Sequence, residues 1–249
     1  MNRKRQNRKA LLLKAGILAA ALLPLLLNAV QAHAQTGDTE NLLYIQGDRF
    51  EYQSNDGNGL YLWDAQGWYG TDFNKFWFKT EGEFLPDQNK TEEAQLQLLY
   101  SRAITSFFDL QAGVRHDFKP DPSRSFAVLG VQGLAPYWFE VDVATFLSDD
   151  GDVSARMEAE YELLLTQRLI AQPRFETNLA LQDVEEAGVG SGINNIELGL
   201  RLRYEIKREF APYVGVSWSK LTGDTKDMAQ DEGEDTDTVS FVTGIRFWF

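Results

Sequence analysis

The chain ends on the stretch "SFVTGIRFWF", Ser240–Phe249, in which apolar and polar side chains alternate up to the last aromatic residues. Alternation with a period of two is the pattern of a β-strand with one apolar and one polar face. In lipid such a strand needs a partner on both edges, because each unpaired amide or carbonyl costs several kcal/mol there. We therefore expect the last strand to pair with the first strand in a closed barrel.

The same alternation continues from about residue 43 to the end of the chain. Residues 137–147 place aromatic and β-branched side chains on one face and Glu140 and Asp142 on the other. Strands of soluble sheets usually have about five or six residues, whereas a tilted strand that crosses a membrane needs about 9 to 11. The sequence predicts an all-β fold, a single 12-stranded antiparallel transmembrane β-barrel, with strands at 43–53, 58–66, 75–84, 93–102, 106–116, 124–133, 136–147, 153–164, 168–181, 194–206, 210–220 and 238–249.

The predicted connections test the topology independently, because bacterial outer-membrane barrels have short periplasmic turns and longer outer loops. Most even-numbered connections are short, such as "AIT", "LA", "LTQ" and "KRE". Several odd-numbered connections are long, including "DVEEAGVGSGIN" and "LTGDTKDMAQDEGEDTD". Only the eight-residue second connection, "GWYGTDFN", and the short first connection depart from the alternation.

The first residues have the composition of a secretory signal. "MNRKRQNRK" is a basic n-region, residues 15–27 are apolar, and "AHA" at 32–34 offers small residues to a signal peptidase. A transmembrane anchor is disfavoured, because that apolar run is shorter than the roughly 20 residues that span a bilayer. We predict a cleaved signal peptide at 1–34, a short periplasmic segment at 35–42 and the outer-membrane barrel at 43–249.

Charge and cysteine usage exclude some functions. The chain carries 24 Lys and Arg against 37 Asp and Glu, and the predicted signal contains basic but no acidic residues, so the mature chain is strongly acidic. Nucleic acid is therefore not expected as a partner. There is no cysteine, which excludes disulfides and thiolate metal ligands.

Two hairpins predict specific pairs. A turn at 165–167 would set Glu158 against Arg174 and Arg156 against Glu176, two favourable cross-strand charge pairs. A turn at 103–105 would set Tyr100 against Phe108 and Leu98 against Leu110 on the apolar face.

Aromatic residues gather at the predicted periplasmic ends of the strands, as in the girdles of membrane barrels; they are Phe107, Phe108, Tyr137, Trp138, Phe210, Tyr213 and Phe247–Phe249. The ending "FWF" resembles the terminal signature by which outer-membrane barrels are recognised by their assembly machinery. Outer-membrane lipid and that machinery are therefore expected partners.

Longer stretches resemble one family. They are "WYGTDFNKFWFKTEGE" (68–83), "RHDFKPDPSRSFAVLGVQGLAPYWFEVD" (115–142), "AEYELLLTQRLI" (159–170), "GSGINNIELGLRLRYEIKREFAPYVGV" (190–216), "EGED" (232–235) and "FWF". Together they resemble the copper resistance protein B family from about Leu43 to Phe249.

The resemblance implies a barrel in the outer membrane of a Gram-negative bacterium that binds copper ions or controls their passage across that membrane. It also raises a periplasmic copper-carrying protein as a partner. Many family members carry a Met- and His-rich segment before the barrel, whereas "QTGDTENL" at 35–42 contains neither residue. This departure favours a role of the barrel itself over copper storage.

Candidate copper ligands are few. Copper(I) prefers thioether or imidazole donors and copper(II) prefers imidazole with oxygen. We predict metal contacts at His116, Asp117 and Met228, with the acidic residues around Met228 concentrating cations. The alternatives are an interfacial His116 and a merely solvated acidic loop. Met157 shares the lipid-facing parity of its strand and is expected to pack.

The polar faces predict a charged lumen. Its proposed ion-pair network contains Arg156, Glu158, Glu160, Arg174, Glu176, Arg201, Arg203 and Glu205. A small barrel often fills its interior with side chains, so this array is either a packed plug or a path for cations.

Two other function classes remain open. A general cation-preferring porin would share the acidic lumen, although twelve strands make a narrower barrel than porins have. A lipase-type hydrolase would need a nucleophile beside a base, and no serine stands at a recognisable spacing from His116. We therefore do not expect an enzyme.

Overall fold

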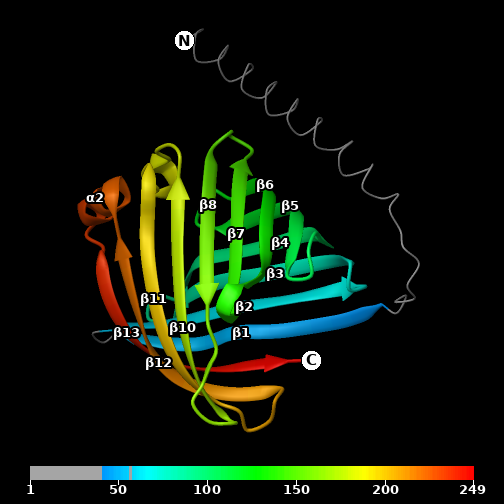
Figure 1. Ribbon diagram of the computed structural model, residues 1–249. Coiled ribbons are helices and arrows are strands. Elements are labelled where there is room, and N and C mark those ends of the chain that lie inside the picture. Colours follow the sequence, from blue (N-terminus) through cyan, green and yellow to red (C-terminus); the bar gives the residue numbers. More distant parts are fainter. Residues whose placement is uncertain (1–40, 56–57) are drawn as a thin grey trace, which may run out of the picture. The chain divides into compact units, whose positions relative to one another are not determined.

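The computed structural model describes residues 41–55 and 58–249 (Figure 1). The predicted signal peptide and most of the predicted segment 35–42 lie outside the described residues. The strands are antiparallel, and each pairs with the next along the chain except β8, which pairs with β10. They are β1 (Leu42–Asn55), β2 (Asn58–Gly70), β3 (Asn74–Leu85), β4 (Lys90–Ala103), β5 (Phe108–Lys119), β6 (Arg124–Ala135), β7 (Phe139–Ser148), β8 (Val153–Glu160), β9 (Leu163–Leu164), β10 (Leu169–Ala180), β11 (Gly192–Tyr204), β12 (Phe210–Leu221) and β13 (Asp237–Trp248).

β8 and β9 together form one wall-crossing strand of the barrel, because both pair with β10. We call each such strand position a stave. The break falls opposite Pro173, whose carbonyl accepts a hydrogen bond from the amide of Tyr161 at 3.2 Å. Proline has no N–H and cannot donate a hydrogen bond back to the neighbouring strand, so the ladder is interrupted there. The sheet therefore has twelve staves, and the predicted 12-stranded barrel is confirmed.

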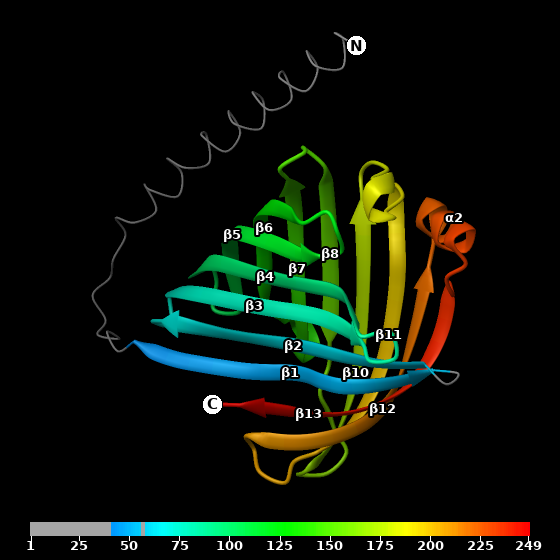
Figure 2. The same cartoon turned by 180° about the vertical axis from the view of Figure 1, so that it is seen from behind.

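The last strand closes the barrel on the first. β13 pairs with β1, with Tyr52 opposite Thr243 and Ser54 opposite Phe241. The amide of Phe249 donates to the carbonyl of Ile45 at 2.8 Å, and the amide of Ile45 donates back at 3.0 Å. Figure 2 shows β1 and β13 side by side at this seam. Pairing of the final residue explains why the alternation of "SFVTGIRFWF" continues to the end.

The two ends of the barrel differ as the connection lengths predict. One end, called here the short-turn end, carries the connections at 71–73, 104–107, 136–138, 165–168 and 205–209. The other, the long-loop end, carries the long connections 181–191 and 222–236. The apparent exception at "GWYGTDFN" disappears, because β2 continues to Gly70 and leaves only residues 71–73 as a turn.

The two predicted hairpin registers are wrong, and both errors arise in the turns. Glu160, not Glu158, lies opposite Arg174, and Glu158 lies opposite Glu176. The predicted partner of Arg156 is likewise replaced by Asn178.

In the other hairpin the apolar pairs are Leu98 with Val114 and Tyr100 with Ala112, in place of the predicted Leu110 and Phe108. In both turns a threonine sets the geometry. Thr166 Oγ1 accepts from the amides of Arg168 and Leu169, at 3.2 and 2.9 Å. Thr105 Oγ1 accepts in the same way from the amides two and three residues later, at 3.2 and 3.0 Å. Both shifts are even numbers of residues, so every side chain keeps its predicted face.

Exposure alternates along the strands as the sequence predicts. In β13, Val239 and Phe241 are 59% and 73% exposed, whereas Ser240 and Val242 are 7% and 3% exposed. The outer surface is therefore apolar and the interior is largely polar. Two residues of the predicted aromatic girdle face inward: Tyr213 is 5% exposed, and Trp248 shares the inward parity of Ser240 and Val242 in β13. Phe107, Tyr137, Trp138 and Phe249 remain exposed near the short-turn end.

The long-loop end carries a short helix, α2 (Gly223–Glu232), inside the connection that was expected to be a loop. Thr225 Oγ1 of α2 accepts hydrogen bonds from the Gly190 amide and Asn194 Nδ2, each at 2.8 Å. The two longest connections are thereby joined. Among the described residues, no helix is long and apolar enough to span a membrane.

Candidate functional site: the charged lumen and its cavity

Three arginines, with side chains 2% to 13% exposed, form the centre of the lumen. Arg49 of β1 and Arg174 of β10 are each 4% exposed, and Arg156 of β8 lies beside them. Arg174 contacts four carboxylates at distances from 2.6 to 3.5 Å: Glu158, Glu160, Glu176 and Glu197. A buried guanidinium is costly unless it is paired and hydrogen-bonded, so this cluster depends on its full set of partners.

The carboxylates themselves form a ladder across four adjacent staves. Asp142 of β7 lies opposite Glu158 of β8, Glu158 opposite Glu176 of β10, and Glu176 opposite Glu197 of β11. Like charges directly opposite each other destabilise a sheet. Here the arginines and Lys79, which pairs with Asp142, compensate this repulsion. The ladder and the arginines are therefore one electrostatic unit.

Some of these ion pairs cross the lumen. Arg156 Nη1 lies 2.6 Å from Glu81 Oε2, although β8 and β3 are separated by β4 to β7 in the sheet. Arg49 joins the same Glu81 at 3.1 Å, Asp64 at 3.1 Å and Glu197 at 3.7 Å. The central network thus links opposite walls and fills the middle of the barrel with charged side chains.

A second network lies near the seam. Arg201 makes a bidentate contact with Glu51, with Nε–Oε2 and Nη2–Oε1 distances of 3.0 and 2.8 Å, and the hydroxyl of Tyr213 donates to Glu51 at 3.0 Å. Arg203 and Arg246 both contact Glu162, at 2.7 and 2.6 Å. Glu205 lies 3.9 Å from Arg203. These pairs brace β1, β11, β12 and β13 against one another.

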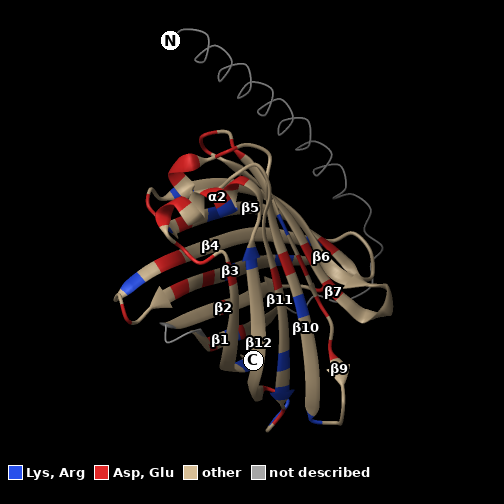
Figure 3. Ribbon diagram, turned by 90° about the vertical axis from the view of Figure 1, so that its left-hand side faces the viewer, with Lys and Arg blue, Asp and Glu red and all other residues tan. Residues whose placement is uncertain are grey.

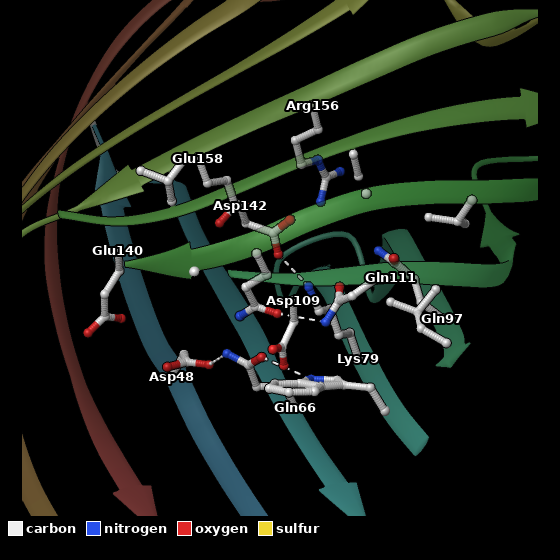
Figure 4. Close-up of a pocket in the computed structure, with 18 of the residues that line it drawn as sticks. Asp48, Gln66, Lys79, Gln97, Asp109, Gln111, Glu140, Asp142, Arg156 and Glu158 are labelled. Carbon is white, nitrogen blue, oxygen red and sulfur yellow. Dashed lines mark hydrogen bonds and ion pairs between the residues drawn. The ribbon is translucent and has the colours of Figure 1, made fainter. Parts of the chain in front are cut away.

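A cavity of about 480 Å³ lies between the short-turn end and the central network (Figure 4). Ser106, Phe107 and Leu134 line it near the turns, and Glu81 and Arg156 line it at mid-barrel. The carboxylates on its wall are Asp48, Asp64, Glu81, Asp109, Glu140, Asp142, Glu158 and Glu160, against the two basic groups Lys79 and Arg156. Glutamine side chains supply amide donors and acceptors. Such a lining favours cations over anions.

The eight predicted lumen residues all take part in these contacts, but the sequence did not point to Arg49, Glu51 or Asp64. For Arg49 and Glu51, both on β1, the reason is local. A β-bulge between Gly47 and Arg49 shifts the register of β1, so simple alternation misassigns the faces there. In the sequence, this bulge is indicated by two adjacent charged residues, Asp48 and Arg49, in a strand that otherwise alternates.

The three predicted metal contacts lie apart. His116 faces the outer surface of β5, where its Nδ1 lies 2.9 Å from Ser125 Oγ and its ring packs edge-on against Phe118. Asp117 faces the lumen and pairs with Arg115 at 2.6 Å. Met228 lies on α2 at the long-loop end. The structure therefore does not bring the three together.

Within residues 41–55 and 58–249, no group of three or more His, Cys, Asp or Glu side chains is arranged to hold a metal ion. Met157, which copper(I) would prefer as a donor, is on the outer face and 40% exposed.

Strand pairing supplies one contact that sequence spacing hid. Ser125 lies directly opposite His116 on β6, so a hydroxyl and an imidazole do meet. Hydrolases of this type also use a third group that orients the imidazole. The contacts described for His116 are a hydroxyl and a phenyl ring, neither of which is a carboxylate or an amide.

The comparisons with known proteins agree with one another. Residues 41–249 match the family described as copper resistance protein B precursor. Copper resistance protein B of Escherichia coli is 46% identical over 220 residues, which covers 88% of this chain and 73% of the relative. The copper resistance protein B homolog of Pseudomonas syringae pv. tomato is 43% identical over 216 residues, covering 86% and 72%.

Solved structures support the fold. The NanC porin has a TM-score of 0.53 at 13% identity, covering 83% of this chain and 99% of the porin. The KdgM porin has a TM-score of 0.50 at 10% identity, with the same coverage. At these identities the similarity shows the barrel fold and carries no information about function. From its sequence match and its closed barrel, this chain belongs to the copper resistance protein B family and is located in the outer membrane.

Proposed function

We propose that the barrel serves copper resistance by controlling the passage of copper ions across the outer membrane, with copper as its cargo. The observation that carries the proposal is the central network, in which Arg156 and Glu81 join opposite walls at 2.6 Å. A carboxylate-rich interior attracts cations, while the cross-lumen ion pairs restrict what passes. Hydrated copper(II) accepts oxygen donors, which the lumen carboxylates supply.

The proposed topology follows from the connections. In outer-membrane barrels the short turns face the periplasm, so the cavity faces the periplasmic side. Outer-membrane lipid would contact the apolar outer face, and the assembly machinery would recognise the terminal aromatics. A periplasmic copper-carrying protein would deliver or receive the ion at the short-turn end.

Flux into proteoliposomes tests this function. Vesicles containing the purified protein and a copper-sensitive dye would be mixed with copper(II), and swelling in a neutral disaccharide would be measured in parallel. Copper entry without sugar swelling supports the proposal. Sugar swelling without cation preference would instead support the general porin. Copper binding with no copper entry would restrict the role to binding.

The predicted ligands need a separate measurement. A His116→Ala and Met228→Ala double variant is expected to bind less copper than the parent in equilibrium dialysis, because these are two of the three predicted contacts and the two that are nitrogen or sulfur donors. Met157→Ala, which alters the outer face, is the matched control. Unchanged copper binding in the double variant would dismiss these ligands while leaving passage through the lumen intact.

A further inference from the structure

A row of aromatic side chains lines the inner face of the short-turn end. It comprises Trp248 of β13, Tyr44 of β1, Trp68 of β2 and Trp77 of β3, and we call it the aromatic row. Its successive ring centroids are 6.1, 6.1 and 6.3 Å apart, with interplanar angles of 29° to 34°. The four strands are neighbours in the sheet (Figure 2), so the rings form one continuous surface.

Three of the four polar groups of the row are hydrogen-bonded within the protein. Trp77 Nε1 donates to Gln66 Oε1 at 3.2 Å and Trp248 Nε1 donates to the Arg208 carbonyl at 2.8 Å. The hydroxyl of Tyr44 donates to Gln46. What the row offers to a ligand is therefore its ring faces, which carry the negative part of the aromatic quadrupole.

The protein places a cation of its own on this surface. Lys75 Nζ lies 5.5 Å from the ring centroid of Trp68 and 5.9 Å from that of Trp77. The same ammonium group lies 2.6 Å from Asp109 Oδ2. An ammonium held between aromatic faces and a carboxylate is the arrangement by which proteins recognise organic cations.

Carboxylates stand in the same part of the lumen. Asp48, Glu140 and Glu162 are within electrostatic range of Tyr44, and Arg246 is the basic group among them. The carboxylate of Glu140 makes no ion pair or hydrogen bond with the side chains of the described residues, and Figure 4 shows it without a dashed line while Lys79 and Asp142 face each other. Glu140 is thus available to an incoming charge.

From the aromatic row, the unpaired Glu140 and the cavity behind Trp77, we propose that the periplasmic mouth binds a small organic cation with ammonium groups, such as a diamine or polyamine. The cavity of about 480 Å³ is in the range that small ligands occupy. Anions are repelled by the carboxylates. Neutral solutes gain nothing from the charges, whereas ammonium groups use both the rings and the carboxylates. This inference goes beyond copper passage and does not depend on it.

Calorimetric titration of the purified barrel in detergent tests the proposal, with spermidine as the probe and magnesium chloride at matched ionic strength as the reference. Saturable spermidine binding that is at least about tenfold tighter than magnesium binding is expected, because only the amine gains the cation–π contacts. Trp68→Leu is expected to weaken spermidine binding about fivefold and leave magnesium binding unchanged. Trp63→Leu, at an outward-facing position of β2, is the matched control.

Two charge variants should act in opposite directions. Glu140→Gln removes an unpaired carboxylate and is expected to weaken spermidine binding about fivefold. Lys75→Met removes the resident ammonium, frees Asp109 and is expected to tighten binding by a similar factor. Glu186→Gln at the long-loop end is the control. A gain and a loss from two single substitutions cannot both come from partial unfolding.

Equal affinity for spermidine and magnesium, or a Trp68→Leu variant that binds spermidine as tightly as the parent, would overturn the proposal. Binding of a neutral disaccharide in place of spermidine would assign the aromatic row to sugars and also overturn it. Copper flux is measured separately in proteoliposomes. A barrel that passes copper but does not bind spermidine would contradict this inference alone. A barrel that binds spermidine but passes no copper would contradict the proposed function alone.

Discussion

At the scale of single residues, buried ion pairs stabilise the interior of the barrel. Glu51 is 2% exposed and Arg201 is 3% exposed, and their bidentate contact is completed by Tyr213. Breaking a buried pair leaves an uncompensated charge, which costs more than the pair itself contributes. Individual lumen residues are therefore expected to affect stability as well as the proposed passage.

Arg201→Met is expected to lower the free energy of unfolding by about 3 kcal/mol, because it leaves the Glu51 carboxylate buried without its guanidinium. Urea unfolding of the barrel in detergent or lipid vesicles measures the loss. Lys220→Met breaks the exposed pair of Lys220 with Asp237, whose side chains are 41% and 51% exposed, and should lower stability far less than Arg201→Met, because solvent screens exposed pairs. Equal losses for the two variants would show that the Glu51 pair is not effectively buried.

At the scale of elements, alternation determines which face each side chain takes, while turns and bulges determine register. Strand positions, their even number and the polar interior were predictable because period-two patterning depends only on adjacent residues. The two hairpin registers were not, because threonine side chains at 105 and 166 hold the turns away from the expected centres.

The candidate site was predictable only in part. Its lumen residues on β8, β10 and β11 follow from parity, but the bulge in β1 hid Arg49 and Glu51. Contacts such as Arg156 with Glu81 join residues far apart in sequence across the lumen. No local pattern specifies which side chains meet there.

Thr166→Val removes the oxygen that accepts from two turn amides and is expected to cost about 1 kcal/mol of stability, similar to the loss of a helix cap. Thr166→Ser keeps the hydroxyl and should restore most of that stability. Urea unfolding compares the two variants. A Thr166→Val protein as stable as the Thr166→Ser protein would show that the turn does not depend on this side chain.

At the scale of the whole molecule, one closed sheet separates an apolar outside from a charged inside, and the acidic residues on α2 lie at the long-loop end (Figure 3). Closure satisfies every strand edge, which lipid requires. The central network then determines how much of the lumen remains open. Fold, location and proposed passage all depend on the seam and on that network.

The seam can be tested by cross-linking, because the chain has no cysteine of its own. Tyr52→Cys with Thr243→Cys places two thiols on directly paired residues of β1 and β13 and should give an intramolecular disulfide on mild oxidation. Non-reducing electrophoresis after denaturation detects the closed loop. Tyr52→Cys with Thr145→Cys, on the distant β7, is the control and should remain uncrosslinked; crosslinking of the control alone would contradict the strand order.

The most direct test of the central claim is the conductance of the barrel in a planar lipid bilayer, compared between the parent and an Arg156→Gln and Glu81→Gln double variant. The cross-lumen ion pair restricts the interior, so the parent should conduct weakly and prefer cations, and the double variant should conduct several-fold more. A parent with a large, unselective conductance that the double variant leaves unchanged would contradict the account.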